Sequence, residues 1–439
     1  MNSLIAVILT TVLFVISGWY LTYLIPSLEK IERLGLSFLL GAGITTFLWF
    51  LLYLAGLPFN LTTLTLASLI EISLGYQLAR HLKLKPIPSH QVKLTRVHLI
   101  LISGVVLSLL IAFLIGTHNP LTAWDSIALY DFRGHAIALN HDLRDITDSS
   151  YYVSYPLMVS LVHAVVYMLG GVSAQGIHAL ILTAFIAVVY GRMKTWTNLT
   201  YALVTCILII GQNEIFAHAT YAYTNLPYLA YLVTGIIYAV SATKKDVYFL
   251  PFAGILIGLS TWVRTSETFW VIGMILILVQ GWLTKHRYMG IISAIMVLMF
   301  RFTWTTYLNQ VLVSINYSYE ETVRSFRYKN VLRIISNWPE IYWYMRLNIF
   351  SPYLGIWLLT IPTAMTAMIK KDTKSILLFG TIFLSTCMLV LGIMVFSTFY
   401  TTWNQIGDSA RRMILFMIPL TIITAVYSTY VISRKEKHE

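Results

Sequence analysis

Long apolar runs recur along the whole chain, separated by short polar segments. A helix of about 20 apolar residues can cross the roughly 30 Å hydrocarbon core of a bilayer. The pattern therefore predicts an all-α polytopic membrane protein with about thirteen transmembrane helices in one continuous membrane domain. The expected spans are residues 4–24, 34–54, 61–82, 97–116, 178–190, 199–211, 226–242, 247–262, 268–282, 289–308, 352–369, 375–396 and 413–431.

Basic residues gather at the ends of these runs and predict an orientation. Short loops rich in Lys and Arg stay in the cytoplasm. The loops concerned hold Lys30 and Arg33, residues 80–96, Arg192 and Lys194, Lys244 and Lys245, Lys285 and Arg287, Lys370, Lys371 and Lys374, and Arg434, Lys435 and Lys437. We therefore expect a multi-pass protein of the cell (plasma) membrane with its N-terminus outside and its C-terminus in the cytoplasm.

The composition excludes a water-soluble fold. Hydrophobic residues make up 58% of the chain and charged residues 11%, whereas a soluble domain holds about 25% charged residues. The formal net charge of +12 follows the basic loops, so it indicates topology and no nucleic-acid partner. Cys206 and Cys387 both lie within apolar runs and are expected to be packing residues, without a disulfide or a zinc site.

The apolar run at residues 155–169 interrupts the alternation of sides. Counting it as a crossing would invert every later basic loop, and it is short for a span, so we expect a re-entrant or interfacial helix on the outer side. Residues 117–175 then form one large outer loop, and residues 309–349 form a second. The second loop breaks the positive-inside trend with Arg324, Arg327, Lys329, Arg333 and Arg346.

Polar chemistry is concentrated in the first outer loop, in the segment TAWDSIALYDFRGHAIALNHDLRDITDSSYYVSYP at residues 122–156. From Ser126 to Asn140 the apolar residues fall on one helical face, which predicts a juxtamembrane helix lying in the interface. These residues are Ala128, Leu129, Phe132, Ala136 and Leu139. Asp125 would stand at the N-terminus of this helix, where an N-cap role and a catalytic role are both open.

Asp131 and His135 are four residues apart, so they share one flank of the predicted helix. That spacing permits a shared proton or a metal ion, and equally a solvated ion pair. We predict no metal site from it. A divalent cation as cofactor stays open, and the cofactor is unknown.

Four segments carry a family resemblance through their order along the chain. They are Trp124-Asp125 ahead of the predicted interfacial helix, Tyr155-Pro156-Leu157 ahead of the non-crossing run, TWVRTSE at residues 261–267, and Arg411-Arg412 ahead of an apolar run with Pro419. Together they resemble the GT-C glycosyltransferases, a polyprenyl-phosphate-dependent superfamily that includes protein O-mannosyltransferases and the aminoarabinose transferases of lipid A. The resemblance covers roughly residues 97–431. The acidic pair common in the first loop of mannosyltransferases is Asp-Ser here, and the late glycine and tyrosine of the family are missing.

The resemblance implies a GT-C-like fold with an N-terminal three-helix membrane bundle at residues 1–96 and a catalytic membrane module at residues 97–439. It implies transfer of a sugar from a polyprenyl-phosphate carrier to a glycan, lipid or protein acceptor by inverting displacement. The roles it implies are catalytic for Asp125 and, as runner-up, Asp131; donor-phosphate binding for Arg264, Arg411 and Arg412; and acceptor contact or support for His135, Tyr155 and Glu267.

Elementary chemistry points the same way. A transferase that uses a lipid-phosphate sugar needs cations that hold the phosphate and a base that accepts the proton of the acceptor hydroxyl. The predicted topology places all three arginines outside, although each one alone is also suited to snorkelling at the interface. Two ionisable residues lie deeper in predicted spans, Glu71 and Arg301, and buried charge in a membrane usually has a partner.

Two other functions stay open on the sequence. A polymerase or ligase of lipid-linked glycans would also need outer arginines. A non-enzymatic transporter or lipid flippase would show repeated halves, broken helices and polar residues near the bilayer midplane. Here the polar residues gather in outer loops instead, which favours the transferase.

Overall fold

The computed structural model describes residues 3–82, 94–143, 155–264, 268–314, 335–396 and 411–435, and within them the chain is helical, with 17 α-helices. The first helices are α1 (Ser3–Trp19), α2 (Lys30–Leu54), α3 (Leu61–Leu82), α4 (Arg96–His118), α5 (Phe132–Asn140), α8 (Met158–Met168) and α9 (Gly176–Trp196). The remainder are α10 (Leu199–Ile210), α11 (Asn213–Tyr221), α12 (Asn225–Ser241), α13 (Phe249–Val263), α14 (Trp270–Leu283), α15 (Arg287–Ser314), α18 (Trp338–Met345), α19 (Leu354–Ile369), α20 (Thr373–Phe396) and α22 (Met417–Lys435).

Seven helical stretches are long and apolar enough to cross a membrane. They are Ser3–Leu24, Lys30–Leu54, Arg96–His118, Gly176–Trp196, Arg287–Val311, Thr373–Met394 and Arg411–Arg434. An eighth is added if α10 and α11, which meet at a bend of 66°, count as one broken span. These helices indicate a multi-pass membrane protein.

The expected number of thirteen spans is therefore wrong. The predicted spans at residues 226–242, 247–262 and 268–282 correspond to α12, α13 and α14, which have only 17, 15 and 14 residues. At 1.5 Å per residue such helices are about 21 to 26 Å long, less than the core of an average bilayer. The apolar run at residues 155–169 becomes α8, with 11 residues, so it too is short for a crossing, as expected.

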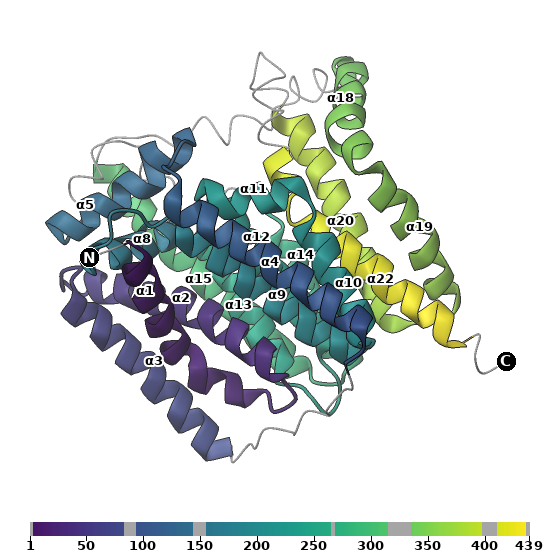
Figure 1. Cartoon of the computed structure of the whole chain (residues 1–439), viewed down its shortest axis with the longest axis horizontal. Coiled ribbons are helices and arrows are strands. Elements are labelled where there is room, and N and C mark those ends of the chain that lie inside the picture. Colours follow the sequence, from purple (N-terminus) through teal and green to yellow (C-terminus); the bar gives the residue numbers. More distant parts are fainter. Residues whose placement is uncertain are drawn as a thin grey trace.

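The helices run obliquely across the view in Figure 1, with α5 and α8 close to the N-terminus and the C-terminus at the opposite end of the bundle. Hydrogen bonds agree with this arrangement. The hydroxyl of Ser3 at the start of α1 accepts hydrogen bonds from the backbone N–H groups of Val172 and Ser173, just before α9. The backbone N–H of Phe59, between α2 and α3, donates to the carbonyl oxygen of His141 over 2.8 Å.

Helices α1 and α2 cross at glycines. A Cβ atom at Gly41 would lie 1.8 Å from the carbonyl oxygen of Phe14, and one at Gly18 would lie 2.2 Å from that of Ser37. Small residues at such crossings let two backbones approach closely, a common device between membrane helices. Helix α3 joins this pair, and α2 also packs against α9. A separate N-terminal bundle at residues 1–96 stays a prediction.

A buried ion pair joins α2 to α9 at the far end from α5 and α8. Arg192 pairs with Glu32 through Nε, and its Nη2 donates to Glu32 Oε2 over 2.7 Å. The hydroxyl of Tyr238 donates to Glu32 Oε1 over 2.9 Å. Lys194 and Glu29 form a second, more exposed pair at 3.1 Å. Two of the basic clusters predicted to share one side of the membrane therefore lie together.

The structure also gives Glu71 a partner. The hydroxyl of Thr45 on α2 donates to Glu71 Oε2 over 2.6 Å, and the carboxyl group is buried between the helices.

Candidate functional site

Asp125 contacts Arg412, although the two residues are 287 positions apart in the sequence. Arg412 Nη1 donates to Asp125 Oδ2 over 2.7 Å, and the side chains are 22% and 26% exposed. Asp125 precedes a short π-helix, η2 (Ser126–Asp131), but its side chain makes no capping hydrogen bond. The contact therefore favours a role for Asp125 at a site with Arg412 over a role as a helix cap.

The connection between α11 and α12 holds both partners in place. The hydroxyl of Ser126 donates to the carbonyl oxygen of Ala222 over 3.3 Å, and Asn225 Nδ2 donates to the carbonyl oxygen of Arg412 over 3.4 Å. The guanidinium of Arg412 lies 5.8 Å from the ring centre of Tyr223. Ala222 has a φ of +56°, a left-handed conformation that ends α11 and turns the chain into this contact.

Tyr130 links this pair to Arg264 and Tyr155. Its hydroxyl lies 3.0 Å from Thr224 Oγ1, and its ring meets that of Tyr155 edge to face at 6.0 Å. Burial raises the pKa of Tyr130; the positive charge of Arg264 opposes this, while nearby Tyr155 and Asp125 add to it. Arg264 is buried at the end of α13. We call Asp125, Tyr130, Arg264 and Arg412 the aspartate–arginine site.

Arg411 takes a different place from its neighbour. Its side chain is exposed, and its charge acts on Tyr353. Burial raises the pKa of Tyr353 to about 12; the negative charge of Glu214 adds to this rise, and the positive charge of Arg411 opposes it. Arg411 and Glu214, at the start of α11, therefore both lie near Tyr353.

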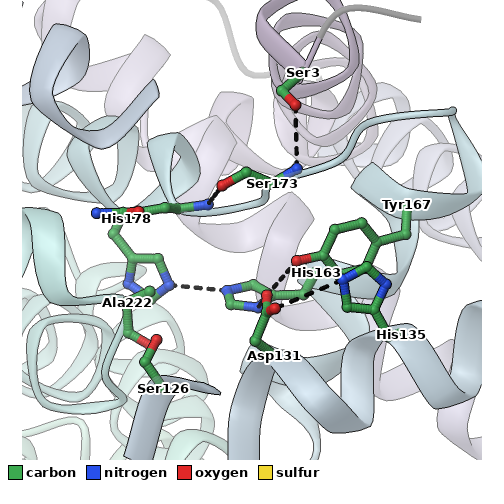
Figure 2. Close-up of polar contacts among 10 residues, drawn as sticks. Ser3, Ser126, Asp131, His135, His163, Tyr167, Ser173, His178 and Ala222 are labelled. Carbon is green, nitrogen blue, oxygen red and sulfur yellow. Dashed lines mark hydrogen bonds and ion pairs between the residues drawn. The ribbon is translucent and has the colours of Figure 1, made fainter. Parts of the chain in front are cut away.

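A second group of residues surrounds Asp131, as Figure 2 shows. The hydroxyl of Tyr167 donates to Asp131 Oδ1, and His163 Nδ1 is 3.2 Å from the same oxygen. Asp131 Oδ2 faces His135 Nε2 at 3.7 Å. His163 Nε2 lies 3.0 Å from His178 Nε2 on α9. We call Asp131, His135, His163, Tyr167 and His178 the Asp131 cluster.

The cluster is buried except for one edge. His163 and His178 are both fully buried, whereas the side chain of His135 is 46% exposed and stacks on Tyr167 with ring centres 3.7 Å apart. Burial raises the pKa of Asp131, but the contacts with His163, Tyr167 and His135 outweigh it, so the pKa of Asp131 lies below its ordinary value. Asp131 is thus a carboxylate at neutral pH.

Arg133 anchors the predicted Tyr-Pro segment. It is fully buried, and its Nη2 donates to the carbonyl oxygen of Pro156 over 3.1 Å. Burial lowers the pKa of Arg133 to about 10, although nearby Tyr130 and Tyr307 oppose the shift. The next helix, α8, packs against α5, so this arginine fixes where α8 begins.

The predicted helix from Ser126 to Asn140 is present as η2 followed by α5, but its faces are used differently than expected. Leu129, predicted to face the interface, is buried, whereas Phe132 and Leu139 are 48% and 76% exposed. The face that meets the protein carries charge, in Asp131 and Arg133. The polar flank of α5 packs against α8 because the side chains of α8 pair with Asp131 on that flank.

Of the predicted site residues, the structure brings Asp125 and Arg412 into contact, with Arg264 and Tyr155 around Tyr130, and joins Asp131 to His135. Glu267 lies outside the described residues, as do the basic residues of the second loop from Arg324 to Arg333. Sequence reasoning missed Tyr130, Arg133, His163, Tyr167 and His178. A signal was present for two of them, because His163 and Tyr167 lie four apart within an apolar run.

A groove of about 380 Å³, lined by apolar and polar side chains, lies where α10 breaks into α11. Its walls come from α4 and from the two broken helices, and they include Gly104, Ser108, Ile207 and Asn213. Within the described ranges no group of three or more His, Cys, Asp or Glu side chains has a geometry that could hold a metal ion.

The fold defines a multi-pass helical membrane protein with groups of polar side chains near the ends of its candidate spans. No protein-family model, curated protein or solved structure matches the chain.

Proposed function

We propose that the protein is a membrane glycosyltransferase of the GT-C type, which transfers a sugar from a polyprenyl-phosphate carrier to an extracytoplasmic acceptor. The observation that carries the proposal is the 2.7 Å contact between Asp125 and Arg412. Glycosyl transfer from a lipid phosphate needs a carboxylate that takes the acceptor's proton and a cation that binds the leaving phosphate, both at one place. Two segments that are 287 positions apart in the sequence supply them.

The pair suggests how donor binding and proton removal are coupled. Without donor, the carboxylate of Asp125 is paired with the guanidinium of Arg412. A donor phosphate beside Arg412 and Arg264 would accept hydrogen bonds from the guanidinium groups and compete with Asp125 for Arg412. The carboxylate of Asp125 is then available to accept the proton of the acceptor hydroxyl.

The transfer itself is a single displacement. The acceptor oxygen forms a bond to the anomeric carbon, the bond from that carbon to the phosphate oxygen breaks, and the proton of the hydroxyl passes to Asp125. The leaving phosphate keeps the electron pair and is stabilised by the arginines. The walls of the groove beside α4 include the apolar side chains of Val105, Ile207 and Phe216, which suit part of an isoprenoid chain.

Turnover by the reconstituted protein tests the proposal. The protein is placed in vesicles with a polyprenyl phosphate that carries a tritiated hexose, together with a membrane extract from cells that lack the gene. Tritium should move from the carrier into the extract. Asp125→Asn should lower this rate by about 100-fold or more, because the amide keeps the shape of the side chain but accepts no proton.

Two further carboxylates in the same loop sharpen this test. Asp142→Asn is the matched control and should keep the wild-type rate. Asp131→Asn tests the runner-up carboxylate. An Asp125→Asn protein that transfers sugar at the wild-type rate would contradict the assignment of the base, and an inactive Asp131→Asn protein beside it would move the base to Asp131.

One observation favours a second candidate function. The 66° break between α10 and α11 is of the kind seen in transporters, where broken helices line a substrate path. A flippase would move a fluorescent polyprenyl phosphate between the leaflets of a vesicle. Such movement without sugar transfer would favour the transporter.

A further inference from the structure

Basic residues crowd the turn between α19 and α20, where Lys370, Lys371 and Lys374 lie within five positions. The turn packs against the last part of α22, because Lys370 Nζ donates to the carbonyl oxygen of Ile432 over 3.4 Å. Arg434 follows two residues later on the same helix. Figure 1 shows α19 and α22 side by side at the end of the bundle near the C-terminus. We call the three lysines and Arg434 the basic end surface.

The carboxylate of this turn, Asp372, is already engaged within the protein. Its Oδ2 accepts a hydrogen bond from the backbone N–H of Ser375 over 2.8 Å, which caps the start of α20. Its Oδ1 accepts one from the hydroxyl of Tyr427 on α22 over 3.2 Å. Asp372 therefore helps to fix the shape of the turn, and both of its oxygens have partners other than the lysines.

The basic end surface differs from the basic end of α9 in its counter-ions. Arg192 and Lys194 on α9 are each paired with a glutamate of α2. Lys371, Lys374 and Arg434 form no ion pair with any residue that the structure describes. Positive charge is therefore in excess beside the α19–α20 turn, and a negatively charged ligand would supply the counter-ion.

Aromatic rings from two other helices hold Lys374 in position. Its Nζ lies 5.0 Å from the ring centre of Trp196 on α9 and 6.0 Å from that of Tyr427 on α22. Such contacts attract the ammonium group and restrict its long side chain. A ligand that binds an ammonium already held in place loses less conformational entropy than one that must order a free lysine. Lys374 is thus prepared for a ligand, and exposed Lys371 lies three residues away.

Exposed apolar side chains flank the lysines and indicate what kind of anion fits. Ile369, the last residue of α19, is 79% exposed, and Ile376 in the first turn of α20 is 40% exposed. Further along the two helices Met365 and Phe383 are exposed as well. A small soluble anion makes no use of such side chains, whereas the acyl chains of a lipid cover them. Basic pockets between membrane helices bind anionic lipid head groups in this way.

We propose that the basic end surface binds the head group of an anionic phospholipid. The lipid phosphate accepts hydrogen bonds from Lys371 and Lys374, Arg434 adds positive charge, and the acyl chains lie along α19 and α20. This inference does not depend on glycosyl transfer. The candidate span Arg411–Arg434 begins beside the aspartate–arginine site and ends at the basic end surface, so the bound lipid anchors the far end of the helix that follows Arg412.

Thermal unfolding of the whole protein in mild detergent identifies the ligand. Phosphatidylglycerol, phosphatidylcholine with the same acyl chains, and inorganic phosphate are each added over a range of concentrations. Phosphatidylglycerol should raise the unfolding temperature, because a ligand that binds only the folded state stabilises it. The other two should leave the temperature unchanged. An equal rise with phosphatidylcholine would show that the charge is irrelevant, and an equal rise with inorganic phosphate would make this a site for a free anion; either result would overturn the proposal.

Variants locate the site. Lys371→Gln combined with Lys374→Gln should weaken binding of phosphatidylglycerol by about 30-fold, roughly fivefold for each charge removed. Lys371→Arg combined with Lys374→Arg keeps both charges and should keep the affinity within a few-fold. Each variant is compared with its own unfolding temperature without lipid, so that a loss of packing at Lys374 does not count as a loss of binding.

The matched control removes two charges from another basic turn. Lys244→Gln combined with Lys245→Gln, between α12 and α13, should keep the wild-type affinity for phosphatidylglycerol. Native mass spectrometry counts the lipid molecules retained by each protein and should show one fewer in the Lys371→Gln, Lys374→Gln protein alone. An equal loss in the control would reduce the effect to diffuse attraction by the whole basic face, and wild-type affinity in both double variants would mean that lipid binds elsewhere. Both results contradict the proposed site.

Discussion

Among the three predicted arginines, Arg412 is the one whose side chain contacts Asp125 within the described residues. Its role in the proposed function is therefore the most directly testable. Both side chains are partly exposed, so their ion pair should add only about 0 to 1 kcal/mol to stability. Arg412→Ala is therefore expected to fold. It should weaken use of the lipid-phosphate donor by tens-fold or more, since charge-assisted contacts contribute about 1.5 to 3 kcal/mol each.

Arg412→Lys separates charge from geometry. Lysine keeps the positive charge but lacks the planar fork, so it should restore donor use only in part. Rates over a range of donor concentrations measure this. Full activity in the alanine variant would make Arg412 a structural residue, and Arg264 would then be the next residue to replace.

Asp131 should make stability depend on pH in the acid range. Because its pKa is lower in the folded protein than in the unfolded chain, its ion pairs stabilise the fold fully above about pH 4 and are lost as the pH falls through the folded value. Asp131→Asn should thus be less stable than the wild type at neutral pH, and the difference should shrink below about pH 4. Thermal unfolding in nanodiscs across this range measures it, and a constant difference would contradict the assignment.

At the scale of elements, the first outer loop is a packed unit of η2, α5 and α8. Helix α8 has only 11 residues, and most of them are buried on every face of the helix. The sequence shows that this run is too short to cross the membrane. It does not show which helix each face of α8 contacts, because that depends on how the helices pack. Here the charged flank of α5 turned inwards because Tyr167 and His163 supply hydrogen bonds to Asp131.

Cysteine labelling tests where this loop lies. Leu139 and Val172 are 76% and 81% exposed, and Tyr288 at the start of α15 is 84% exposed. Single cysteines at these positions, in a background without Cys206 and Cys387, react with a membrane-impermeant maleimide on intact cells. We expect labelling at positions 139 and 172 from outside, and at position 288 only after permeabilisation.

The two loop positions are the decisive comparison. Labelling of positions 139 and 172 on opposite sides would make α8 a crossing element and invert every later helix. Labelling of all three positions from the cytoplasmic side would keep the fold and reverse the orientation.

At the scale of the whole molecule, the sequence predicted correctly those features that depend on the local pattern of apolar residues. The all-helical class, the extent of the helix from Ser126 to Asn140 and the shortness of α8 follow from apolar periodicity. For Asp125 and Arg412 the sequence predicted only that both lie on the same side of the membrane. It did not predict their contact, because the distance between them depends on how α22 packs. His178 was missed for the same reason, since it meets His163 only where α8 docks on α9. Helices shorter than a bilayer span, such as α14, were counted as crossings because apolar composition does not reveal where a helix ends.

The buried pair of Glu32 and Arg192 offers the last prediction, on how the first helices are attached to the rest. Glu32→Ala leaves the guanidinium of Arg192 buried without its carboxylate, which should cost about 3 to 5 kcal/mol. Replacing both residues by methionine removes both charges and should recover much of that loss. Unfolding by denaturant in mild detergent measures the free energy. Glu29→Ala is the matched control, because its pair with Lys194 has side chains 17% and 20% exposed, and should cost only about 0 to 1 kcal/mol. Equal losses for the two alanine variants would show that α2 and α9 are held by their apolar contact alone, with the ion pair adding nothing specific.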